Sequence, residues 1–342
     1  MLEKMVDTND EWIVQRSGVR ERRIAKNTHT WELALGAAQD ALADAGITAE
    51  ELDLILVSTC SPDTNTPNTA AILQDKLGAG AIGAFDINNA CTGFVSATDI
   101  ADCYIKSGKA RTVLVVSAET LSRIVDYTDR GTCILFGDGA GAVVLEWRDE
   151  TEAGAAEAAG AAEAAGADAP GILSSYMENT DDVDRTLWCD SAFASREVPF
   201  AADGTTTAAG PSAPDAPRLA AADAESDPYM RMAGQAVFKF ATSAMIRCTE
   251  EALTRAGLTT DDVTLFTPHQ ANERIIRYAA KKMGLPMERF QVIIDHVGNV
   301  SGASALIALN EALCEGKLQP GDIACMTAFG GGLTAGSCVI RI

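Results

Sequence analysis

The stretch that decides the fold occurs twice in the chain. "ALADAGITAEELDLILVST" (residues 41–59) aligns without gaps on "ALTRAGLTTDDVTLFTPHQ" (residues 252–270). Each copy reads as the end of an amphipathic helix, a glycine stop, an acidic turn and a short apolar strand. The repetition predicts an α/β fold built from two related halves, with a functional site between them.

The repeat continues downstream of each copy. A further helix pattern ends at "LQDKLG" (residues 73–78) in the first copy and at "AAKKMG" (residues 279–284) in the second. Later, "KSGKARTVLVVSAE" loosely matches "CEGKLQPGDIACMTA", each reading as a helix end, a basic turn and a strand. We therefore expect two domains, residues 1–175 and residues 176–342.

Two low-complexity stretches separate the copies. Residues 148–170 are rich in Ala, Glu and Gly, and residues 201–227 are rich in Ala, Pro, Gly and Thr. Neither carries enough large apolar side chains to offset the entropy lost on ordering, so we interpret both as solvated surface insertions. An Ala-rich helix of marginal stability is the alternative for the first stretch.

Composition narrows the class of protein. The 342 residues are 47% hydrophobic and 22% charged with a formal net charge of −21, which disfavours general binding to nucleic acid or an anionic membrane. No apolar run of about 18 residues predicts a membrane span, and the first residues do not have the pattern of a signal peptide. The nine cysteines are scattered and none lies in a C-x-x-C pair, which favours reduced thiols in the cytoplasm over disulfides or a zinc site.

One cysteine lies where chemistry is favoured. In "AFDINNACTGFVSATDIADCYIKSG" (residues 84–108), Cys91 falls between a predicted strand and a predicted helix. Free N–H groups and the macrodipole at a helix N-terminus favour an anion, so we expect a lowered thiol pKa and a thiolate nucleophile there. The same N–H groups would bind a developing oxyanion. A small buried thiol at a tight turn is the alternative interpretation.

Two polar residues follow in the second half. His269 ends the second-copy strand, the place where α/β sheets bind ligands, whereas its counterpart in the first copy is Ser58. Asn299 lies in a glycine-flanked turn that opens a helix. Taken alone, the histidine also fits a solvated loop and the asparagine a helix cap. His29 and His296 have no comparable setting, and we interpret both as structural or exposed.

Two glycine-rich stretches have different interpretations. "AFGGGLTAGS" (residues 328–337) places three glycines between two strands, where the backbone can approach a ligand closely. "FGDGAGAVVL" (residues 136–145) superficially matches a dinucleotide fingerprint, but a predicted strand follows its glycines where the fingerprint requires a helix. Nucleotide binding by that fingerprint is therefore not expected.

A cysteine, a histidine and an asparagine in this order, across a duplicated α/β chain, resemble the thiolase-fold condensing enzymes. The closest resemblance is to β-ketoacyl-acyl carrier protein synthase III, and it covers nearly all of the chain outside the two insertions. It is carried by "LEKMVDTNDEWIVQRSGVRERRIA", "DINNACTGF", "YTDRGTCILFGDGAGAVVL", "MAGQAVFKFA", "PHQANERII", "HVGNVSGAS" and "AFGGGLTAGS". The resemblance implies a duplicated five-layer αβαβα fold in two pseudo-twofold-related halves, and a homodimer.

The resemblance also assigns roles at the reacting centre. Cys91 matches the acylated nucleophile, and His269 and Asn299 match the pair that drives decarboxylation and holds the resulting enolate. Phe329 matches the aromatic residue that shields the nucleophile. Gly331 matches the loop that forms an oxyanion hole with the Cys91 N–H.

Residues farther from that centre match binding positions of the family. Trp12 and Arg130 match residues that enclose the adenine of coenzyme A, with Arg16 and Thr8 in a matching segment and Gln235 where the pantetheine tunnel usually has Asn. The positions matched to the carrier protein are Lys239, Gln270 and Arg274. A helix over residues 272–283 would align Arg274, Arg277, Lys281 and Lys282 near one face; a solvated charged face is the alternative. Thr66 replaces a Phe of the primer pocket, which favours a longer or branched primer.

The implied reaction joins an acyl-CoA primer to malonyl-acyl carrier protein and initiates type II fatty acid synthesis. It needs no cofactor, because the coenzyme A thioester is itself a substrate. A related condensing enzyme of polyketide or quinolone type, a thiol hydrolase and an inactive truncated paralogue remain as alternatives. The family's first strand, upstream of "LEKMVD", is absent from this sequence, and "NNAC" is more polar than the run that usually precedes the nucleophile.

Overall fold

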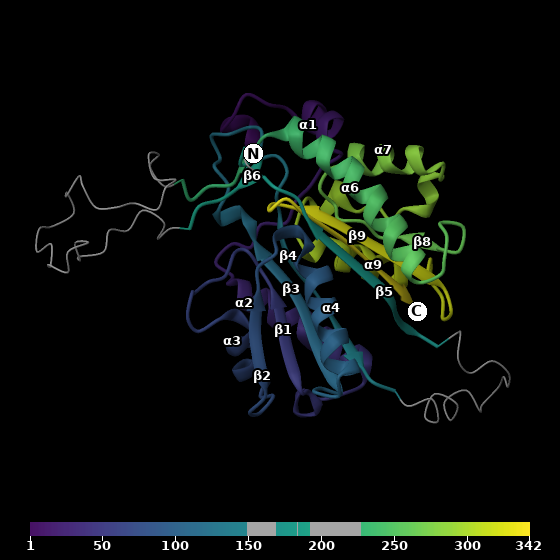
Figure 1. Ribbon diagram of the computed structural model, residues 1–342. Coiled ribbons are helices and arrows are strands. Elements are labelled where there is room, and N and C mark those ends of the chain that lie inside the picture. Colours follow the sequence, from purple (N-terminus) through teal and green to yellow (C-terminus); the bar gives the residue numbers. More distant parts are fainter. Residues whose placement is uncertain (149–168, 183, 192–226) are drawn as a thin grey trace, which may run out of the picture.

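The computed structural model describes residues 1–148, 169–182, 184–191 and 227–342, which form two stacked α/β halves (Figure 1). The predicted insertions at 148–170 and 201–227 lie almost entirely outside these residues. The first half contains α1 (Asp10–Ser17), α2 (Thr30–Ala45), β1 (Leu54–Ser58), α3 (Thr69–Leu77), β2 (Gly83–Ile87), α4 (Gly93–Lys106), β3 (Thr112–Thr120) and β4 (Asp138–Glu146). None of the described helices is long and apolar enough to cross a bilayer.

The second half begins with three additional strands and then follows much of the same order. It contains β5 (Gly171–Asn179), β6 (Leu187–Trp188), β7 (Arg231–Met232), α6 (Gly234–Arg255), β8 (Leu265–Phe266), α7 (Glu273–Met283), α8 (Ile294–Val297), α9 (Ala303–Cys314), β9 (Ile323–Gly330) and β10 (Thr334–Arg341). The boundary predicted at 175/176 falls inside β5, all of which pairs with β10 of the second sheet. The halves therefore divide before β5.

The two sheets have matching topology. The first has the order β2-β1-β3-β4 and the second the order β5-β10-β9-β8. β1 runs parallel to β3, which pairs antiparallel with β4; likewise β8 runs parallel to β9, which pairs antiparallel with β10. Beside β8, the position that β2 holds beside β1 is marked by a single parallel bridge between Phe266 and Phe290. This correspondence confirms the duplication predicted from the repeat.

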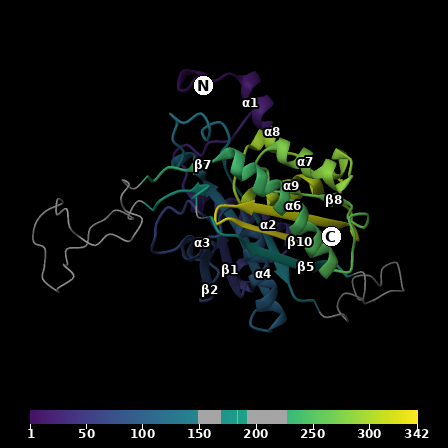
Figure 2. The same ribbon diagram turned by 45° about the horizontal axis from the view of Figure 1, so that its top comes forward.

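Helices α4 and α9 form the buried middle layer. Leu56 and Val115 of the first sheet, Phe94 of α4, Leu309 of α9 and Met326 of the second sheet belong to one buried cluster that joins both halves. Helices α2 and α3 cover the outer face of the first sheet, and α6 and α7 cover the outer face of the second. The result is the predicted five-layer αβαβα architecture (Figures 1 and 2).

Local sequence explains where the repeated helices end. Helix α2 stops at Gly46 with a φ of 69°, and the turn after α6 contains Gly257 with a φ of 71°. Both conformations lie in the left-handed region that glycine occupies without steric cost. Residues 138–146, which include most of the false dinucleotide fingerprint, form strand β4.

Helix α1 belongs to the first half in sequence but packs against the second. The side-chain amide of Asn272 donates to the Arg16 carbonyl at 3.1 Å, and the Arg20 N–H donates to the Asp295 carbonyl at 2.8 Å. Figure 2 shows α1 lying next to α8 at this end of the molecule. The chain thus closes one side of the space between the halves with its own N-terminal segment.

Candidate active site

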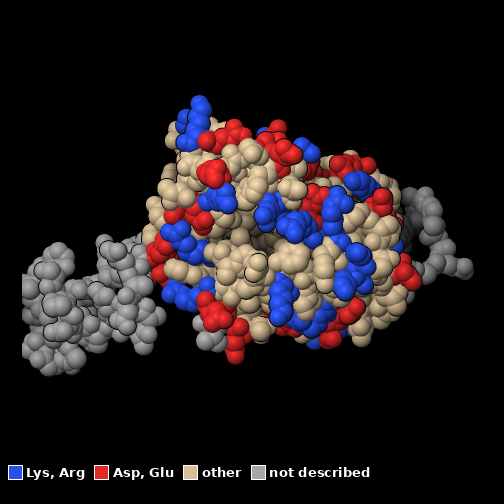
Figure 3. Space-filling view, turned by 90° about the horizontal axis from the view of Figure 1, so that it is seen from above, with Lys and Arg blue, Asp and Glu red and all other residues tan. Residues whose placement is uncertain are grey.

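A cavity of about 1130 Å³ opens at the carboxyl ends of the parallel strands. Cys91, His269, Asn299, Phe329 and Gly331 all line it, so the structure brings together the five residues predicted at the reacting centre. Figure 3 shows Lys and Arg side chains gathered around a hollow in the face above these strands. The position agrees with the general location of ligand sites in α/β sheets.

Cys91 lies in a short 3₁₀ turn (Ala90–Thr92) that leads directly into α4. Its side chain is buried, and burial raises the pKa of the thiol to about 12, opposed in part by a hydrogen bond with Ser301. The predicted lowering of this pKa is therefore wrong for the free protein, because desolvation of the thiolate outweighs the helix N-terminus. Cys91 rests as a thiol and must lose its proton during any acyl transfer.

His269 is fixed from two sides. Its backbone N–H donates to the Thr327 carbonyl at 2.8 Å, and its Nδ1 lies 2.6 Å from the hydroxyl of Ser304. The residue is 1% exposed, and burial lowers the pKa of the imidazole to about 3. The ring is therefore neutral at physiological pH.

The Ser304 hydroxyl lets His269 take either neutral tautomer. This hydroxyl lies 2.6 Å from Nδ1 and can also donate to the Ser301 carbonyl at 2.8 Å. If it donates to Nδ1, the proton of the ring is on Nε2 and the ring is a donor there. If it donates to the Ser301 carbonyl, Nδ1 carries the proton and Nε2 is free to accept one.

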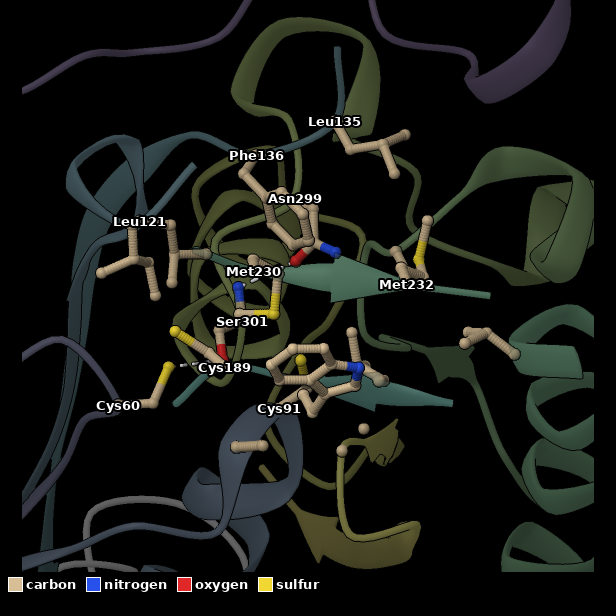
Figure 4. Close-up of a pocket in the computed structure, with 18 of the residues that line it drawn as sticks. Cys60, Cys91, Leu121, Leu135, Phe136, Cys189, Met230, Met232, Asn299 and Ser301 are labelled. Atoms are coloured by element: carbon tan, nitrogen blue, oxygen red, sulfur yellow. Dashed lines mark hydrogen bonds between the residues drawn. The ribbon is translucent and has the colours of Figure 1, made fainter. Parts of the chain in front are cut away.

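Asn299 is held with its amide nitrogen available. The Ser301 N–H donates to its Oδ1 at 2.9 Å, which assigns the oxygen and leaves the NH₂ group without that partner. Its backbone bonds to the Leu135 carbonyl and the Gly137 N–H, both at 2.9 Å, and so ties the turn to the end of the first sheet. Asn299 projects into the cavity close to Phe136 (Figure 4).

The glycine run approaches the nucleophile, and Gly330 is the glycine nearest to Cys91. A Cβ at Gly330 would lie 2.9 Å from the Cys91 nitrogen, whereas a Cβ at Gly331 would meet the Leu187 carbonyl. Gly330 is therefore the position where a side chain is excluded beside Cys91. The Phe329 ring is buried and packs edge-on against His269, with centroids 5.3 Å apart.

The mouth of the cavity carries the predicted aromatic and cationic pair. The Arg130 guanidinium lies 4.9 Å from the centroid of the Trp12 ring, and that of Arg16 lies 5.6 Å from it. Trp12 and Arg16 line the cavity. Thr8 is only partly exposed, its hydroxyl is buried, and it is not among the lining residues.

Two predicted binding residues are placed differently by the structure. Gln270 is fully buried; its side chain donates to the Pro268 and Gln291 carbonyls and accepts from the Ile293 N–H, so it holds the loop and cannot touch a carrier protein. Gln235 is exposed on the first turn of α6 but does not line the cavity, although Gly234 does. Both assignments came from alignment with family motifs, which does not show where a side chain points.

The predicted cationic face is present on α7. Arg274, Arg277, Lys281 and Lys282 are all exposed, while Ile275, Ile276, Ala279 and Ala280 are buried beneath them. Arg277 forms an ion pair with Glu273, which reduces the free positive charge. Arg274 also lines the cavity. Lys239 is exposed on α6 and directly follows Phe238, which lines the cavity.

Apolar side chains form the remaining wall beside Cys91. They include Leu121, Phe136, Met230 and Met232, which Figure 4 shows around the same space. Thr66 also lines the cavity from the loop after β1 and is exposed in the single chain. A flexible thioether adapts to irregular neighbours, so this wall suits an acyl chain.

The sequence did not single out three residues that lie near Cys91 in the structure. They are Cys60, Glu119 and Ser301, which lie in or directly behind the cavity wall. Glu119 is the penultimate residue of β3 and Cys60 lies just after β1, so the pairing of these two strands brings them together. Of the three, Ser301 alone lies in a segment that carries the family resemblance, "HVGNVSGAS".

Comparison with known proteins finds relatives that align with this chain over nearly its whole length. Family models for 3-oxoacyl-[acyl-carrier-protein] synthase III match residues 85–164, and those for its C-terminal part match residues 253–342. The chain is 43% identical over 341 residues to the β-ketoacyl-[acyl-carrier-protein] synthase III of Xanthomonas campestris pv. campestris, covering 99% of this chain and 92% of the relative.

Solved structures agree. The 3-oxoacyl-[acyl-carrier-protein] synthase III of Aquifex aeolicus matches with a TM-score of 0.82 and 41% identity, over 100% of this chain and 94% of the other. The priming β-ketosynthase of the R1128 polyketide pathway matches with the same TM-score at 30% identity, over 100% and 90%. Identity above 40% over nearly the whole length establishes that the chain belongs to the 3-oxoacyl-[acyl-carrier-protein] synthase III family.

Proposed function

We propose that this chain is the condensing acyltransferase that starts type II fatty acid synthesis. It transfers an acyl group from acyl-CoA to Cys91 and joins it to malonyl-acyl carrier protein, releasing coenzyme A and CO₂ and forming 3-oxoacyl-acyl carrier protein. The observation that carries the proposal is the convergence of Cys91, His269 and Asn299 on one cavity, two of them from the second half and one from the first.

The first half-reaction is acylation of Cys91. Since burial raises the pKa of this thiol, its proton must leave as the sulfur attacks the thioester carbon. His269 is neutral and, when the Ser304 hydroxyl donates to the Ser301 carbonyl, has Nε2 free to accept that proton. The Cys91 N–H, next to the side-chain-free Gly330, is placed to hold the thioester oxyanion.

The second half-reaction is decarboxylation and condensation. The Asn299 NH₂ group and a protonated His269 Nε2 donate to the malonyl thioester oxygen, and so stabilise the enolate that forms as CO₂ leaves. The enolate carbon attacks the acyl-Cys91 thioester and the Cys91 sulfur leaves. The two tautomers of His269 allowed by Ser304 match the two tasks, acceptor first and donor second.

The proposed substrates match the surroundings of the site. Trp12 and Arg130 at the mouth would hold the adenine end of acyl-CoA after separating to admit it, because their side chains contact one another in this structure. The exposed cations of α7 and Lys239 offer a surface for an acidic carrier protein. We propose that no metal or further cofactor takes part, and that dialysis against a chelator leaves the activity unchanged.

The oligomer and location follow the family. We propose a homodimer in which Thr66 faces the partner's primer pocket, and a cytoplasmic protein, consistent with nine free cysteines. A priming synthase of polyketide type is the second candidate, since one such structure matches over the whole chain. Measured preference for the carrier protein of fatty acid synthesis over a polyketide carrier separates the two.

Intact mass spectrometry tests the proposal. The full chain is mixed with acetyl-CoA, isobutyryl-CoA and longer acyl-CoAs, beside the variants Cys91→Ala and Cys189→Ser, the second being a control thiol that lines the same cavity. We expect one acyl adduct on the unmodified chain and on Cys189→Ser, and none on Cys91→Ala. Absence of any adduct, or an adduct that survives Cys91→Ala, contradicts the proposal. Strict preference for acetyl-CoA would contradict the larger primer inferred from Thr66.

A further inference from the structure

A second thiol lines the cavity beside Cys91. Cys60 follows β1 and Cys91 follows β2, two adjacent parallel strands paired from Leu54 with Gly83 to Ser58 with Ile87. The Thr59 N–H continues this pairing by donating to the Ile87 carbonyl at 3.1 Å. Because neighbouring strands lie about 4.8 Å apart, the segments that leave their ends start side by side.

Ser301 lies next to both cysteines. The Cys60 Sγ lies 4.0 Å from the Ser301 Oγ, and Cys91 forms a side-chain hydrogen bond with the same residue. Figure 4 shows Ser301 close to both cysteines, with the dashed line running from it to Cys60. Besides burial and Glu119, the Cys91 thiol also contributes to the raised pKa of Cys60, so the two side chains lie near each other in the same cavity. A disulfide would require the two Cα atoms to lie within about 7 Å of each other and the two sulfurs to turn toward one another.

A buried carboxylate is placed to act on Cys60. Both oxygens of Glu119 lie 3.4 Å from the Cys60 Sγ and accept from its backbone N–H at 3.1 and 3.2 Å. The other donors to Glu119 are the hydroxyls of Thr59 and Ser61, so its recorded partners are uncharged. Burial raises the pKa of Glu119 to about 7, which makes it an effective proton acceptor near neutral pH.

The mechanism of condensation gives Cys60 no task. It is not in the motif of the nucleophile, and burial together with the charge of Glu119 raises the pKa of its thiol well above the ordinary value. A thiol in that state is a poor nucleophile unless a base removes its proton during attack. Glu119 is that base, and the sulfur it serves faces Cys91.

We propose that Cys60 is a resolving thiol that converts oxidised Cys91 into a reversible Cys60–Cys91 disulfide. In the first step the Cys91 sulfur bonds to one oxygen of a hydroperoxide that enters the cavity, and its proton passes to His269. The O–O bond breaks, the other oxygen takes up the proton and leaves as an alcohol or water, and Cys91 becomes sulfenic acid. The Cys60 sulfur then attacks the Cys91 sulfur, and its proton passes to Glu119. Hydroxide leaves Cys91 and takes that proton to form water, so one disulfide and one water are made.

The disulfide blocks acylation while it lasts, since the Cys91 sulfur is occupied. It also keeps Cys91 from the sulfinic and sulfonic acids, which thiols do not reverse. A small thiol such as dithiothreitol, or coenzyme A in the cavity, reopens it by exchange. The inference depends on the reactivity of Cys91 with oxidants and not on the condensation reaction.

Non-reducing peptide mass spectrometry tests this on the full chain. The unmodified chain, Cys60→Ser and Cys189→Ser are treated with hydrogen peroxide, then with or without dithiothreitol. Cys189 is the matched control, because it lines the same cavity but its Sγ lies against the Pro228 carbonyl at 3.1 Å. We expect a linked peptide joining residues 60 and 91, with loss of two hydrogens, in the unmodified chain and in Cys189→Ser.

The variant without Cys60 should behave differently. In Cys60→Ser, Cys91 should gain two or three oxygens, and dithiothreitol should restore less than a tenth of the acyl-adduct formation of its own untreated sample; the unmodified chain should recover nearly all. Glu119→Gln should slow appearance of the linked peptide by about tenfold, as expected for loss of a general base. Absence of the 60–91 peptide, or equal recovery in Cys60→Ser, overturns the proposal. The peptide readout needs no substrate, so it stands even if no acyl-CoA reacts.

Discussion

The two halves place different chemistry at the same points of one fold. Two residues before its central helix, the first half has Cys91 and the second has Ser301; at the end of the repeated strand, the first has Ser58 and the second has His269. Ser58 is buried so tightly that a Cβ at Gly93 would overlap its hydroxyl, whereas His269 faces the cavity. In the proposed mechanism, the first half therefore provides the nucleophile and the second half provides the hydrogen-bond donors on the same duplicated scaffold.

The largest expected effect comes from removing each half's contribution separately. Cys91→Ala should lower condensation by at least about 10⁴-fold but leave decarboxylation of a malonyl thioester measurable, because His269 and Asn299 remain. His269→Ala should slow formation of the acyl adduct, because it removes the proposed proton acceptor, and should lower decarboxylation by about 10²- to 10³-fold. Intact mass and CO₂ release measure the two steps. Equal loss of both steps in both variants would refute this division of labour.

Crowding at Ser58 should appear in stability. Gly93→Ala adds a methyl group where the Ser58 hydroxyl already lies, and overpacking of this kind costs about 1–3 kcal/mol. Urea unfolding measures the loss. The double variant Ser58→Gly with Gly93→Ala should recover most of it, since the obstructing side chain is gone. If the double variant does not recover the lost stability, the backbone conformation at the start of α4, and not contact with Ser58, is the reason that residue 93 must be glycine.

Ser304 should affect rate more than binding. Ser304→Ala removes the hydroxyl that lets His269 exchange tautomers, so we expect kcat to fall about tenfold while KM for acyl-CoA changes little. The pH dependence of kcat should also change shape, which simple loss of packing would not cause. Ser304→Thr, which keeps the hydroxyl, should restore part of the rate. An unchanged pH profile in Ser304→Ala would contradict the assigned role.

The smallest expected effect concerns His296, the other histidine of the second half. Asp295 and Glu311 contact its two ring nitrogens at 2.8 and 3.1 Å and raise its pKa despite partial burial. The stabilisation is therefore present below the ordinary histidine pKa and is lost as pH rises through the raised value. His296→Gln should destabilise by about 0.5 kcal/mol or less near pH 5.5 and have almost no effect near pH 9. Thermal melts at both pH values measure the difference, and equal destabilisation at both would contradict it.

The sequence predicted the fold and three residues that converge on the cavity, because both leave local patterns. The repeat shows itself in helix ends, glycine stops and apolar strands, and Cys91, His269 and Asn299 each follow or open a recognisable element. The direction of the Cys91 pKa was wrong, since desolvation depends on neighbours far away in sequence. Gln270 stands next to His269 but points inward to three backbone groups, and no periodicity in its loop reveals this. Cys60 and Glu119 meet only because β1 pairs with β3.

Strand β4 has one more consequence. In the second sheet, β5 pairs along the outer edge of β10, but among the described residues no strand pairs along the outer edge of the corresponding β4. That edge carries "AVVL" (residues 142–145) without a proline, and an apolar edge of this kind is a template for strand addition. Its hydrogen-bonding groups can recruit the edge of another molecule. Oligomers or fibres that form as the protein is concentrated would then grow from the first half, while β5 acts in the second as a built-in cover against them.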